Sequence, residues 1–350
     1  MAGNFVQLHN HTHYSLLDGA SKVPDLVKRV KELGMPAVGI TDHGNMHGAY
    51  ELWRAAVDSG VKPIIGIEAY VTPETARQDK TRVSWDTNWT PVPGHARNPD
   101  DVSGGGLITH LTMWAENDEG LVNLIKASSV ANLEGRVMRY PRMDKEVLST
   151  YSKGVIASSG CPSGIIQTRL RLGQFDEALR AAGEFQDIFG KDNFYIELMD
   201  HGLSIESKVT GDLLTIAKKL GAPLLATNDS HYVMEADKDA QDAMLCINSG
   251  ATLDDPNRFK FEGSGYYIKS AEEMRELFKD HPDACDNTLE IAERCNVIFD
   301  DHEDGAFMPQ FDCPEGWDET SLFLKKVEEG LEKRYDGNPP MEVLKQADYE

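Results

Sequence analysis

Short apolar runs alternate with longer amphipathic stretches over the first two thirds of the chain. Strands of a parallel sheet are buried on both faces and read as continuous apolar runs, whereas covering helices repeat apolar positions every three to four residues. The runs predicted to be strands are residues 5–8, 37–41, 63–71, 107–114, 154–158, 193–198 and 222–227. This pattern predicts an α/β fold in which βα units surround a parallel sheet.

The amphipathic stretches between these runs predict helices, and several of them end at a glycine, such as Gly34 and Gly221. The predicted helices are residues 23–33, 46–59, 120–131, 175–189 and 205–220. Repeated βα crossovers either close into a barrel or form an open sheet. Seven near-equivalent units favour a distorted, TIM-like (β/α)7 barrel, and periodicity alone leaves the open sheet as the alternative.

Residues 72–106 interrupt this rhythm, because they are polar, contain four prolines and end in a run of glycines. We predict a long loop here. A loop of this length is usually either functional or disordered, and the sequence leaves both alternatives open.

The pattern becomes helical after Tyr232. Helices are predicted at residues 236–249, 271–279, 284–297 and 320–335, with turn-rich segments at 254–265 and 300–316. We therefore predict a barrel domain over residues 1–280 and a helical extension over 281–350. The apolar stripe of residues 322–335 has no later partner to bury it, which suggests that the chain continues into a further domain.

Composition sets limits on the class of protein. With 350 residues and 40% hydrophobic content, the chain can form one large α/β domain and an appendage. Its apolar runs are far shorter than the ~20 residues of a membrane span, and five irregularly spaced cysteines do not form a disulfide framework. We expect a soluble, cytoplasmic protein with no membrane partner.

The formal net charge of −23 should repel a polyanion, which argues against a stand-alone DNA-binding protein. If nucleic acid is the substrate, bound cations must offset the local carboxylates. Basic surface elsewhere in a larger protein would then have to hold the strand.

Candidate metal ligands recur at the carboxyl ends of the predicted strands, where α/β barrels place their active sites. His9 and His11 follow the first run, and alternate residues of an extended chain point the same way. A lone histidine is more often structural, but two at this spacing favour a shared cation, since imidazole suits zinc, iron and similar ions. Asp229 and His231 repeat this spacing after the seventh run.

Between these pairs, the second strand run ends at Asp42 and His43, of which we favour His43 as a ligand. Glu68 lies within an apolar run, where an ionised carboxylate is costly unless it is paired or bound to a metal, so the alternative is a structural salt bridge. On its own, Asp18 is better explained as an Asx turn or helix cap than as a metal ligand. His110 could be a neutral core histidine.

Cys161 stands in a glycine-flanked turn after a predicted strand. Buried cysteines are commonly inert, so metal ligation and a packing role are both open. A nucleophilic role is weaker, because the sequence assigns no general base to this thiol.

The same residues lie in motifs that resemble a known family. HNHTHYS followed by LDGA, TDHGNM, PIIGIEAY, THLTMWA, SGCPSG, ELMDHG and ATNDSHY resemble the polymerase and histidinol phosphatase (PHP) domain of bacterial DNA polymerase III α subunits. The resemblance runs from about residue 5 to 335 and includes DPNRFKF and GYYIKS, which free-standing phosphatases of the family would not need. Residues 323–335 resemble the opening of the polymerase palm domain.

The resemblance implies a (β/α)7 barrel that binds three divalent metal ions, either zinc, manganese or iron. His9, His11, Glu68 and Asp229 resemble the ligands of the first ion. Glu68 would also bridge to a second ion.

Two further sets of ligands follow from the same resemblance. His110 and Cys161 would complete the second site, and Asp18, His43 and His231 would hold the third ion. We expect Glu68, Asp229 and His231 to take part in catalysis. His13, Asp200 and His201 receive no role.

These residues predict metal-assisted hydrolysis of phosphate esters, in which a hydroxide of lowered pKa attacks phosphorus. The substrate implied by the resemblance is the 3′ end of a DNA primer, which gives 3′–5′ proofreading exonuclease activity within a replicative polymerase. One alternative is a non-catalytic scaffold that braces the polymerase or docks an exonuclease subunit. Another is a broad phosphoesterase or pyrophosphatase that acts on small substrates. The implied partners are the rest of the polymerase chain and other replisome subunits.

Overall fold

The computed structural model describes residues 5–90, 98, 100–299 and 309–350. The chain forms two compact units, Met1–Phe299 and Asp300–Glu350. The sequence placed a boundary after residue 280, whereas in the structure the first unit continues through α11 (Pro282–Arg294), whose Asn287 side chain donates to the Leu224 carbonyl oxygen at the start of β7.

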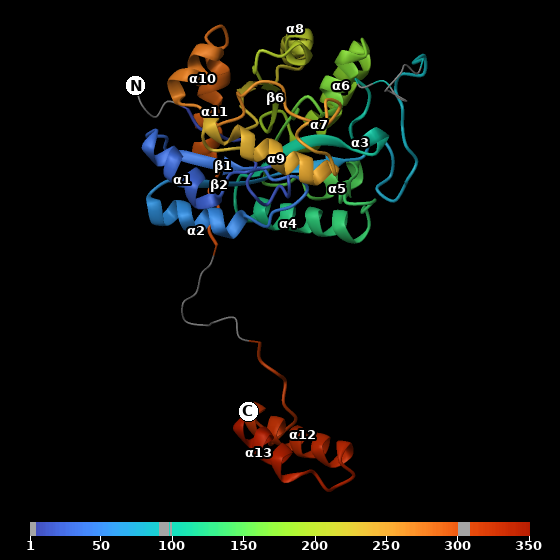
Figure 1. Ribbon diagram of the computed structural model, residues 1–350, viewed down its shortest axis with the longest axis vertical. Helices are drawn as coiled ribbons and strands as arrows, with labels where there is room; N and C mark the ends of the chain where they lie inside the picture. Colours follow the sequence, from blue (N-terminus) through green and yellow to red (C-terminus); the bar gives the residue numbers. More distant parts are fainter. Residues whose placement is uncertain (1–4, 91–97, 99, 300–308) are drawn as a thin grey trace. The chain divides into compact units, whose positions relative to one another are not determined.

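A curled sheet flanked by helices makes up the first unit (Figure 1). Its neighbouring strands follow the order β1-β2-β3-β5-β6-β7, and β4 pairs with β2. The strands are β1 (Ala37–Ile40), β2 (Lys62–Val71), β3 (Thr109–Ala115), β4 (Arg142–Met143), β5 (Val155–Ser158), β6 (Phe194–Leu198) and β7 (Leu224–Ala226). Every residue of β1, β5 and β6 is buried, as the continuous apolar runs predicted.

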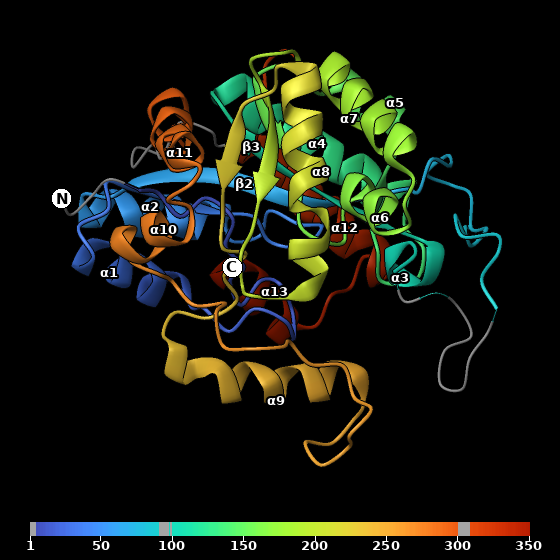
Figure 2. The ribbon, with the colours of Figure 1, turned by 90° about the horizontal axis from the view of Figure 1, so that it is seen from above.

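Most helices lie against this sheet, whereas α9 (Lys238–Ser249) stands apart from it (Figure 2). The helices match most of the predicted amphipathic stretches. They are α1 (Val23–Glu32), α2 (Ala49–Ser59), α3 (Ser103–Gly106), α4 (Asp118–Leu133), α5 (Lys145–Thr150), α6 (Ile165–Arg171), α7 (Phe175–Phe189) and α8 (Ser204–Leu220), followed by η1 (Glu235–Asp237), α9 (Lys238–Ser249), α10 (Ala271–Leu277) and α11. The predicted α/β class with a helical extension is therefore confirmed. The short elements β4, α3, α5 and α6 were not predicted.

The first predicted strand, residues 5–8, forms no regular strand but still connects the two edges of the sheet. The Gly39 amide donates to the Gln7 carbonyl on the β1 side, and the His11 amide donates to the Ser230 carbonyl on the β7 side. A side chain at position 39 would clash, because an added Cβ would lie 2.6 Å from the Leu8 carbonyl oxygen. The segment from residue 7 to 11 thus closes the sheet into a distorted barrel.

The prediction of an all-parallel sheet was wrong for one strand. β3 runs antiparallel to both β2 and β5. The chain leaves β2 at Val71, and residues 72–108 bring it back to the same end of the sheet, so β3 begins where its neighbours end. A buried strand shows the same apolar run in either direction, and therefore the sequence pattern could not reveal this reversal.

The described part of the 72–106 loop packs on the barrel. The fully buried Arg142 guanidinium donates to the carbonyl oxygens of Arg77 and Asp79, and the Asp101 carboxylate accepts from the amide of Trp85. The Arg169 guanidinium lies 3.8 Å above the Trp85 ring. Of the four prolines in the predicted loop, those at 91, 93 and 99 lie outside the described residues.

The second unit contains α12 (Glu319–Arg334) and α13 (Met341–Tyr349), neither of which has a buried residue. Phe323 and Leu324 of the predicted apolar stripe are exposed. Part of the turn-rich segment predicted at 300–316 lies outside the described residues. Within the described part of the chain, no helix has both the length and the apolar character needed to cross a lipid bilayer.

Candidate metal centre

His9 and His11 lie side by side at the end of the segment that closes the barrel. Both are fully buried, and their Nε2 atoms are 3.3 Å apart. Their backbone is held by Ser230, which donates to the His9 carbonyl and accepts from the His11 amide. The alternate spacing predicted from the sequence therefore does direct two imidazoles to one place.

Asp229 faces this histidine pair from the opposite edge of the sheet. Its Oδ1 atom lies 3.3 Å from His9 Nε2 and 3.0 Å from His11 Nε2. The backbone of Asp229 has a φ of 44°, which an L residue adopts only at a cost and which often marks a functional site. Its neighbour Asn228 fixes this conformation by donating from Nδ2 to the Gly265 and Tyr267 carbonyls, each at 2.8 Å.

Glu68, on β2, lies at the middle of the cluster and is fully buried. One carboxylate oxygen is 2.6 Å from His43 Nδ1 and 3.2 Å from His110 Nδ1, and the other is 3.5 Å from His9 Nε2. A single carboxylate thus faces imidazoles on both sides. A carboxylate placed in this way would be able to serve two neighbouring cations.

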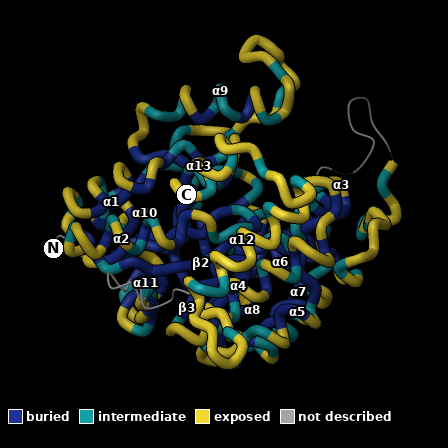
Figure 3. The backbone as a smooth tube through the Cα atoms, turned by 90° about the horizontal axis from the view of Figure 1, so that it is seen from below, coloured by how far each residue is buried: buried dark blue, intermediate teal, exposed yellow. Residues whose placement is uncertain are grey.

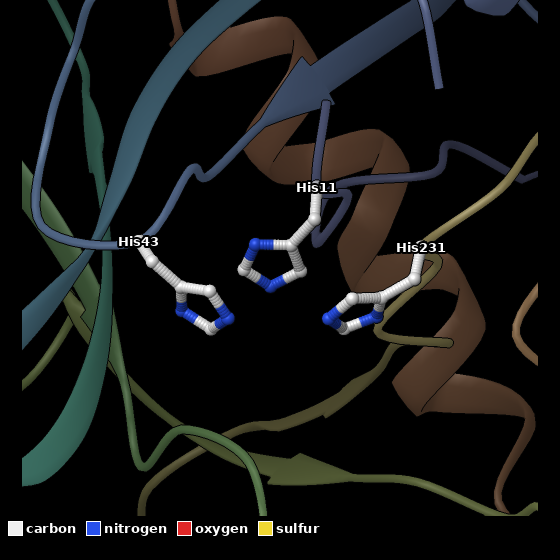
Figure 4. Close-up of side chains that lie close together, drawn as sticks. All are labelled: His11, His43 and His231. Atoms are coloured by element: carbon white, nitrogen blue, oxygen red, sulfur yellow. The ribbon is translucent and has the colours of Figure 1, made fainter. Parts of the chain in front are cut away.

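A third part of the cluster contains Asp18, His43 and His231. His43 Nε2 is 2.9 Å from Asp18 Oδ2, and His231 Nε2 is 3.8 Å from the same oxygen. The rings of His43 and His231 both face the His11 ring, with centroid distances of 4.1 and 4.3 Å (Figure 4). The turn predicted around Asp18 is present, and the carboxylate nevertheless points into the cluster.

His110 and Cys161 complete the cluster, with the Cys161 sulfur 3.3 Å from His110 Nδ1. The prediction that His110 stands at the carboxyl end of a strand was wrong, because it is the second residue of β3. It still reaches the site, since the antiparallel strand begins at the end of the sheet where β2 and β5 finish. All nine sequence-predicted ligands are therefore brought together.

Burial and mutual proximity shift the pKa values of these groups. Burial raises the pKa of the Glu68 carboxyl, but the charges of His110 and His43 outweigh it and hold this pKa well below its ordinary value. Burial alone would lower the pKa of His9, yet the Glu197 and Asp229 carboxylates raise it. Burial and the neighbouring His43 lower the pKa of His11 to about 3.

The pKa of the Cys161 thiol is raised by burial and by the nearby carboxylates, so a thiolate at this position needs a cation beside it.

The donor atoms fit a set of divalent cations. Glu68 Oε1 and Oε2, Asp229 Oδ1, His43 Nδ1 and His231 Nε2 are all buried, and although some of them lie close to one another or to His11, none of these contacts has the geometry of a hydrogen bond. Leaving such atoms unpaired is costly unless a cation takes the place of the missing proton donors. Among the described residues, three sets converge closely enough to hold an ion: His9, His11 and Asp229; His43, Glu68 and His110; and His11, His43 and His231. Mixed imidazole, carboxylate and thiolate donors suit zinc, manganese and iron.

Glu197 is a residue that the sequence reasoning missed. It is fully buried on β6, and its carboxylate accepts from His9 Nδ1 at 2.6 Å, from the Thr227 hydroxyl at 2.6 Å and from the Ser158 hydroxyl at 2.5 Å. A carboxylate on the far nitrogen of a histidine leaves the other nitrogen free to bind a metal and makes it more basic. The signal was available, because Glu197 lies in an apolar strand run just as Glu68 does.

Asp42 supports the cluster without facing it. Its carboxylate accepts from the Thr12 amide at 2.7 Å and from the Ser15 hydroxyl at 2.7 Å, and the Ser15 hydroxyl in turn lies 3.0 Å from His11 Nδ1. Asp42 therefore fixes the turn that follows His11 and leaves the neighbouring His43 to point inward.

The residues without a predicted role lie outside the cluster. His13 is partly buried and stacks beside Tyr14, and Asp200 is exposed. His201 Nδ1 lies 2.6 Å from Glu206, and its Nε2 lies 3.0 Å from the Asn228 carbonyl. His201 thus supports the backbone that presents Asp229.

Comparisons with known proteins agree with the sequence motifs. Residues 7–201 match the family model described as "PHP domain". The chain is 50% identical over 348 residues to the DNA polymerase III subunit alpha of Mycobacterium leprae, covering 99% of this chain and 29% of that protein. It is 39% identical over 350 residues to the corresponding subunit of Borreliella burgdorferi, covering 99% of this chain and 28% of that protein. The chain thus spans less than a third of the length of these curated relatives.

Two solved structures show a weaker likeness. An amidohydrolase from Chromobacterium violaceum is 16% identical with a TM-score of 0.39, covering 65% of this chain and 87% of that one. A two-domain protein from Bacteroides vulgatus, described as containing a predicted PHP-like metal-dependent phosphoesterase, is 13% identical with a TM-score of 0.36, covering 81% of this chain and 62% of that one. Both scores are below 0.5, and we base no conclusion on them.

Proposed function

The chain belongs to the PHP domain family, and on that premise we propose that it is a metal-dependent phosphoesterase acting as a 3′–5′ exonuclease on DNA primer ends, as part of a DNA polymerase III α subunit. The observation that supports this proposal is the convergence of nine side chains that could bind metal, five of which carry a buried oxygen or nitrogen atom without a hydrogen-bond partner among the described residues: Asp18, His43, Glu68, Asp229 and His231. A purely structural cluster would pair these atoms with proton donors.

We assign the ligands as the sequence suggested, with three divalent cations of zinc, manganese or iron. His9, His11, Glu68 and Asp229 would hold the first, and Glu68, His110 and Cys161 the second. Asp18, His43 and His231 would hold the third. Bound there, such cations supply Lewis acidity toward a phosphoryl oxygen and make a water molecule acidic enough to act as a nucleophile near neutral pH.

The protein's own residues prepare the site for an anionic substrate. The Asp18, His43, His110 and Asp229 side chains are 13–20% exposed, whereas those of His9, His11 and Glu68 are fully buried. The partly exposed residues define the side from which a phosphodiester can approach. The fully buried ones hold the site rigid from beneath.

Charge explains why cations must be present before substrate binds. Three carboxylates, Asp18, Glu68 and Asp229, share the site in a chain whose formal net charge is −23. A phosphate group would be repelled by them unless cations offset their charge. The rest of the polymerase chain and other replisome subunits, which we propose as cytoplasmic partners, would supply the basic surface that holds the DNA strand.

Elemental analysis of the purified chain, run beside degradation of a primer with a mismatched 3′ end, tests the proposal. The expected result is bound zinc, manganese or iron together with primer shortening. Asp229→Asn should abolish most of the shortening and lower the metal content, whereas Asp212→Asn, on the exposed face of α8, should change neither.

Two outcomes would contradict this function. A metal-free chain that leaves the primer intact would indicate a scaffold that braces the polymerase. A metal-loaded chain that hydrolyses small phosphate esters or pyrophosphate but not the primer would indicate a broad phosphoesterase.

A further inference from the structure

Two phenylalanines stand next to the metal centre in the turn that follows α9. Phe259 is 62% exposed, and Phe261 is partly buried. The two rings meet edge to face, with centroids 5.9 Å apart. Figure 3 shows the mostly exposed segment that extends from the end of α9.

Phe261 connects this pair to the proposed metal ligands. The edge-to-face contact between Phe261 and His231 has a centroid distance of 4.6 Å, and the Phe261 ring lies 4.7 Å from that of Tyr266. The Tyr266 carbonyl accepts from the His231 amide at 2.8 Å. An apolar aromatic surface therefore continues from a ligand of the centre out to solvent.

The turn is anchored, so the rings are held in place. The Arg258 guanidinium donates to both carboxylate oxygens of Asp242 in α9, at 2.5 and 2.6 Å, and to the Leu253 carbonyl at 3.2 Å. A bidentate pair of this kind fixes orientation as well as position. α9 is itself held over the centre, because its Gln241 side chain donates to the Asp18 carbonyl.

We propose that Phe259 and Phe261 stack on a base of the nucleic acid whose phosphodiester lies at the metal centre. This inference rests on the proposed function. The metal ligands would contact the phosphodiester, whereas the two phenylalanines would contact the base. Stacking on aromatic side chains tolerates every base, because each base has a π face, and a proofreading enzyme must remove any of them. Successive nucleotides of one strand are about 3.4 Å apart, so both rings lie within a few nucleotides of His231.

The turn places one cation beside the aromatic pair, and Asp254, Asp255 and Glu262 lie in the same segment. Lys260 lies between the two phenylalanines and is exposed. It adds a cation beside an aromatic pair in a chain that is otherwise strongly acidic. Aromatic rings combined with positive charge are typical of surfaces that bind single strands.

The test uses two single-stranded oligonucleotides that differ only at the 3′ end, one with normal bases and one with abasic sugars over the last three positions. Binding is measured by fluorescence anisotropy with the manganese-loaded chain and strands whose last linkages are phosphorothioates that resist hydrolysis, and cleavage is measured with the same chain and ordinary phosphodiester strands. Phe259→Ala should weaken binding of the normal strand by roughly 5- to 100-fold and leave the abasic strand unchanged. Phe259→Trp should restore binding, and the matched control Phe323→Ala, 65% exposed in α12, should have no effect.

The outcomes separate this inference from the proposed function. An equal effect of Phe259→Ala on both strands, or no effect on either, would overturn the stacking role even if the primer is hydrolysed. The second result would fit a surface that instead packs against another part of a longer polymerase chain. Base-dependent binding without any hydrolysis by the metal-loaded wild type would sustain stacking and overturn the exonuclease proposal.

Discussion

Replacing Glu197 by glutamine should weaken metal binding without unfolding the protein. In the structure one oxygen of Glu197 accepts from His9 and Thr227, and the other accepts from the Ser158 hydroxyl. A glutamine placed with its carbonyl toward His9 keeps the first two bonds, and Ser158 can turn its hydroxyl to accept from the new amide. The substitution therefore removes the negative charge while it keeps the volume and the hydrogen bonds.

The size of the effect follows from the role of the lost charge. Losing a carboxylate that supports a ligating histidine typically costs 10- to 100-fold in metal affinity, or about 1.4–2.7 kcal/mol. The loss should be confined to the ion that we assign to His9, because the Glu197 carboxylate accepts hydrogen bonds only from His9, Thr227 and Ser158 among the described residues. Competition with a fluorescent chelator measures the affinity, and elemental analysis gives the number of ions that remain.

Two controls separate metal affinity from folding. Denaturant unfolding in excess chelator should show nearly equal stability for Glu197→Gln and wild type, and Glu272→Gln on the exposed face of α10 should match wild type throughout. An affinity within about twofold of wild type would refute the supporting role of Glu197. A large loss of stability in the chelated protein would show that the residue mainly holds the strands together.

Three further perturbations have definite expected outcomes. Arg142→Met should lower the free energy of unfolding by about 4 kcal/mol or more, because it leaves four carbonyl oxygens without their donor at about 1–3 kcal/mol each. Faster proteolysis within residues 72–90 should accompany this loss, and unchanged denaturant unfolding would contradict it. A ligand that binds only the folded state stabilises that state, so chelation of bound metal should lower the melting temperature of the wild-type protein. The melting temperature of Glu68→Gln should fall much less, because this variant has lost a proposed ligand. Equal falls in the two proteins would place the metal elsewhere. Burial lowers the pKa of Lys269 to about 8 in the folded protein, compared with about 10.5 in the unfolded chain. Between about pH 8 and pH 10.5 the unfolded chain therefore binds more protons than the folded protein, and the free energy of unfolding should rise with pH in this range. Denaturant unfolding at pH 8 and pH 10 should show this rise in wild type relative to Lys269→Met, and parallel behaviour of the two proteins would exclude it.

The sequence predicted which residues meet in the cluster better than it predicted the strands that carry them. His9 and His11 could be found because alternate residues of an extended chain share a side, which is a local property. Asp229 and His231 have the same spacing, but the φ of 44° at Asp229 shows that they meet in the cluster through a turned backbone. Glu68 could be found because a charged group in an apolar run needs a partner. Glu197 is also a charged group in an apolar run, but it pairs with the His9 nitrogen that points away from the cluster. An apolar run therefore reveals a buried carboxylate without showing whether it would contact a metal or support a histidine.

The direction of β3 could not be predicted, because it depends on where the preceding loop returns the chain and not on the residues of the strand. His110 was therefore identified for a partly mistaken reason. The turn containing Cys161 is similar, since only the fold shows that its sulfur lies 3.3 Å from His110. Local patterns predict which residues are candidates, whereas the path of the chain decides which of them meet.

The closing segment of the barrel has a consequence for biosynthesis. His9 and His11 emerge from the ribosome first, yet the groups that face them, Asp229 and His231, follow only after the last barrel strand has been made. A nascent chain that lacks this strand can hold neither the first nor the third proposed ion. Loading of these two proposed ions can therefore follow only once the last barrel strand is in place.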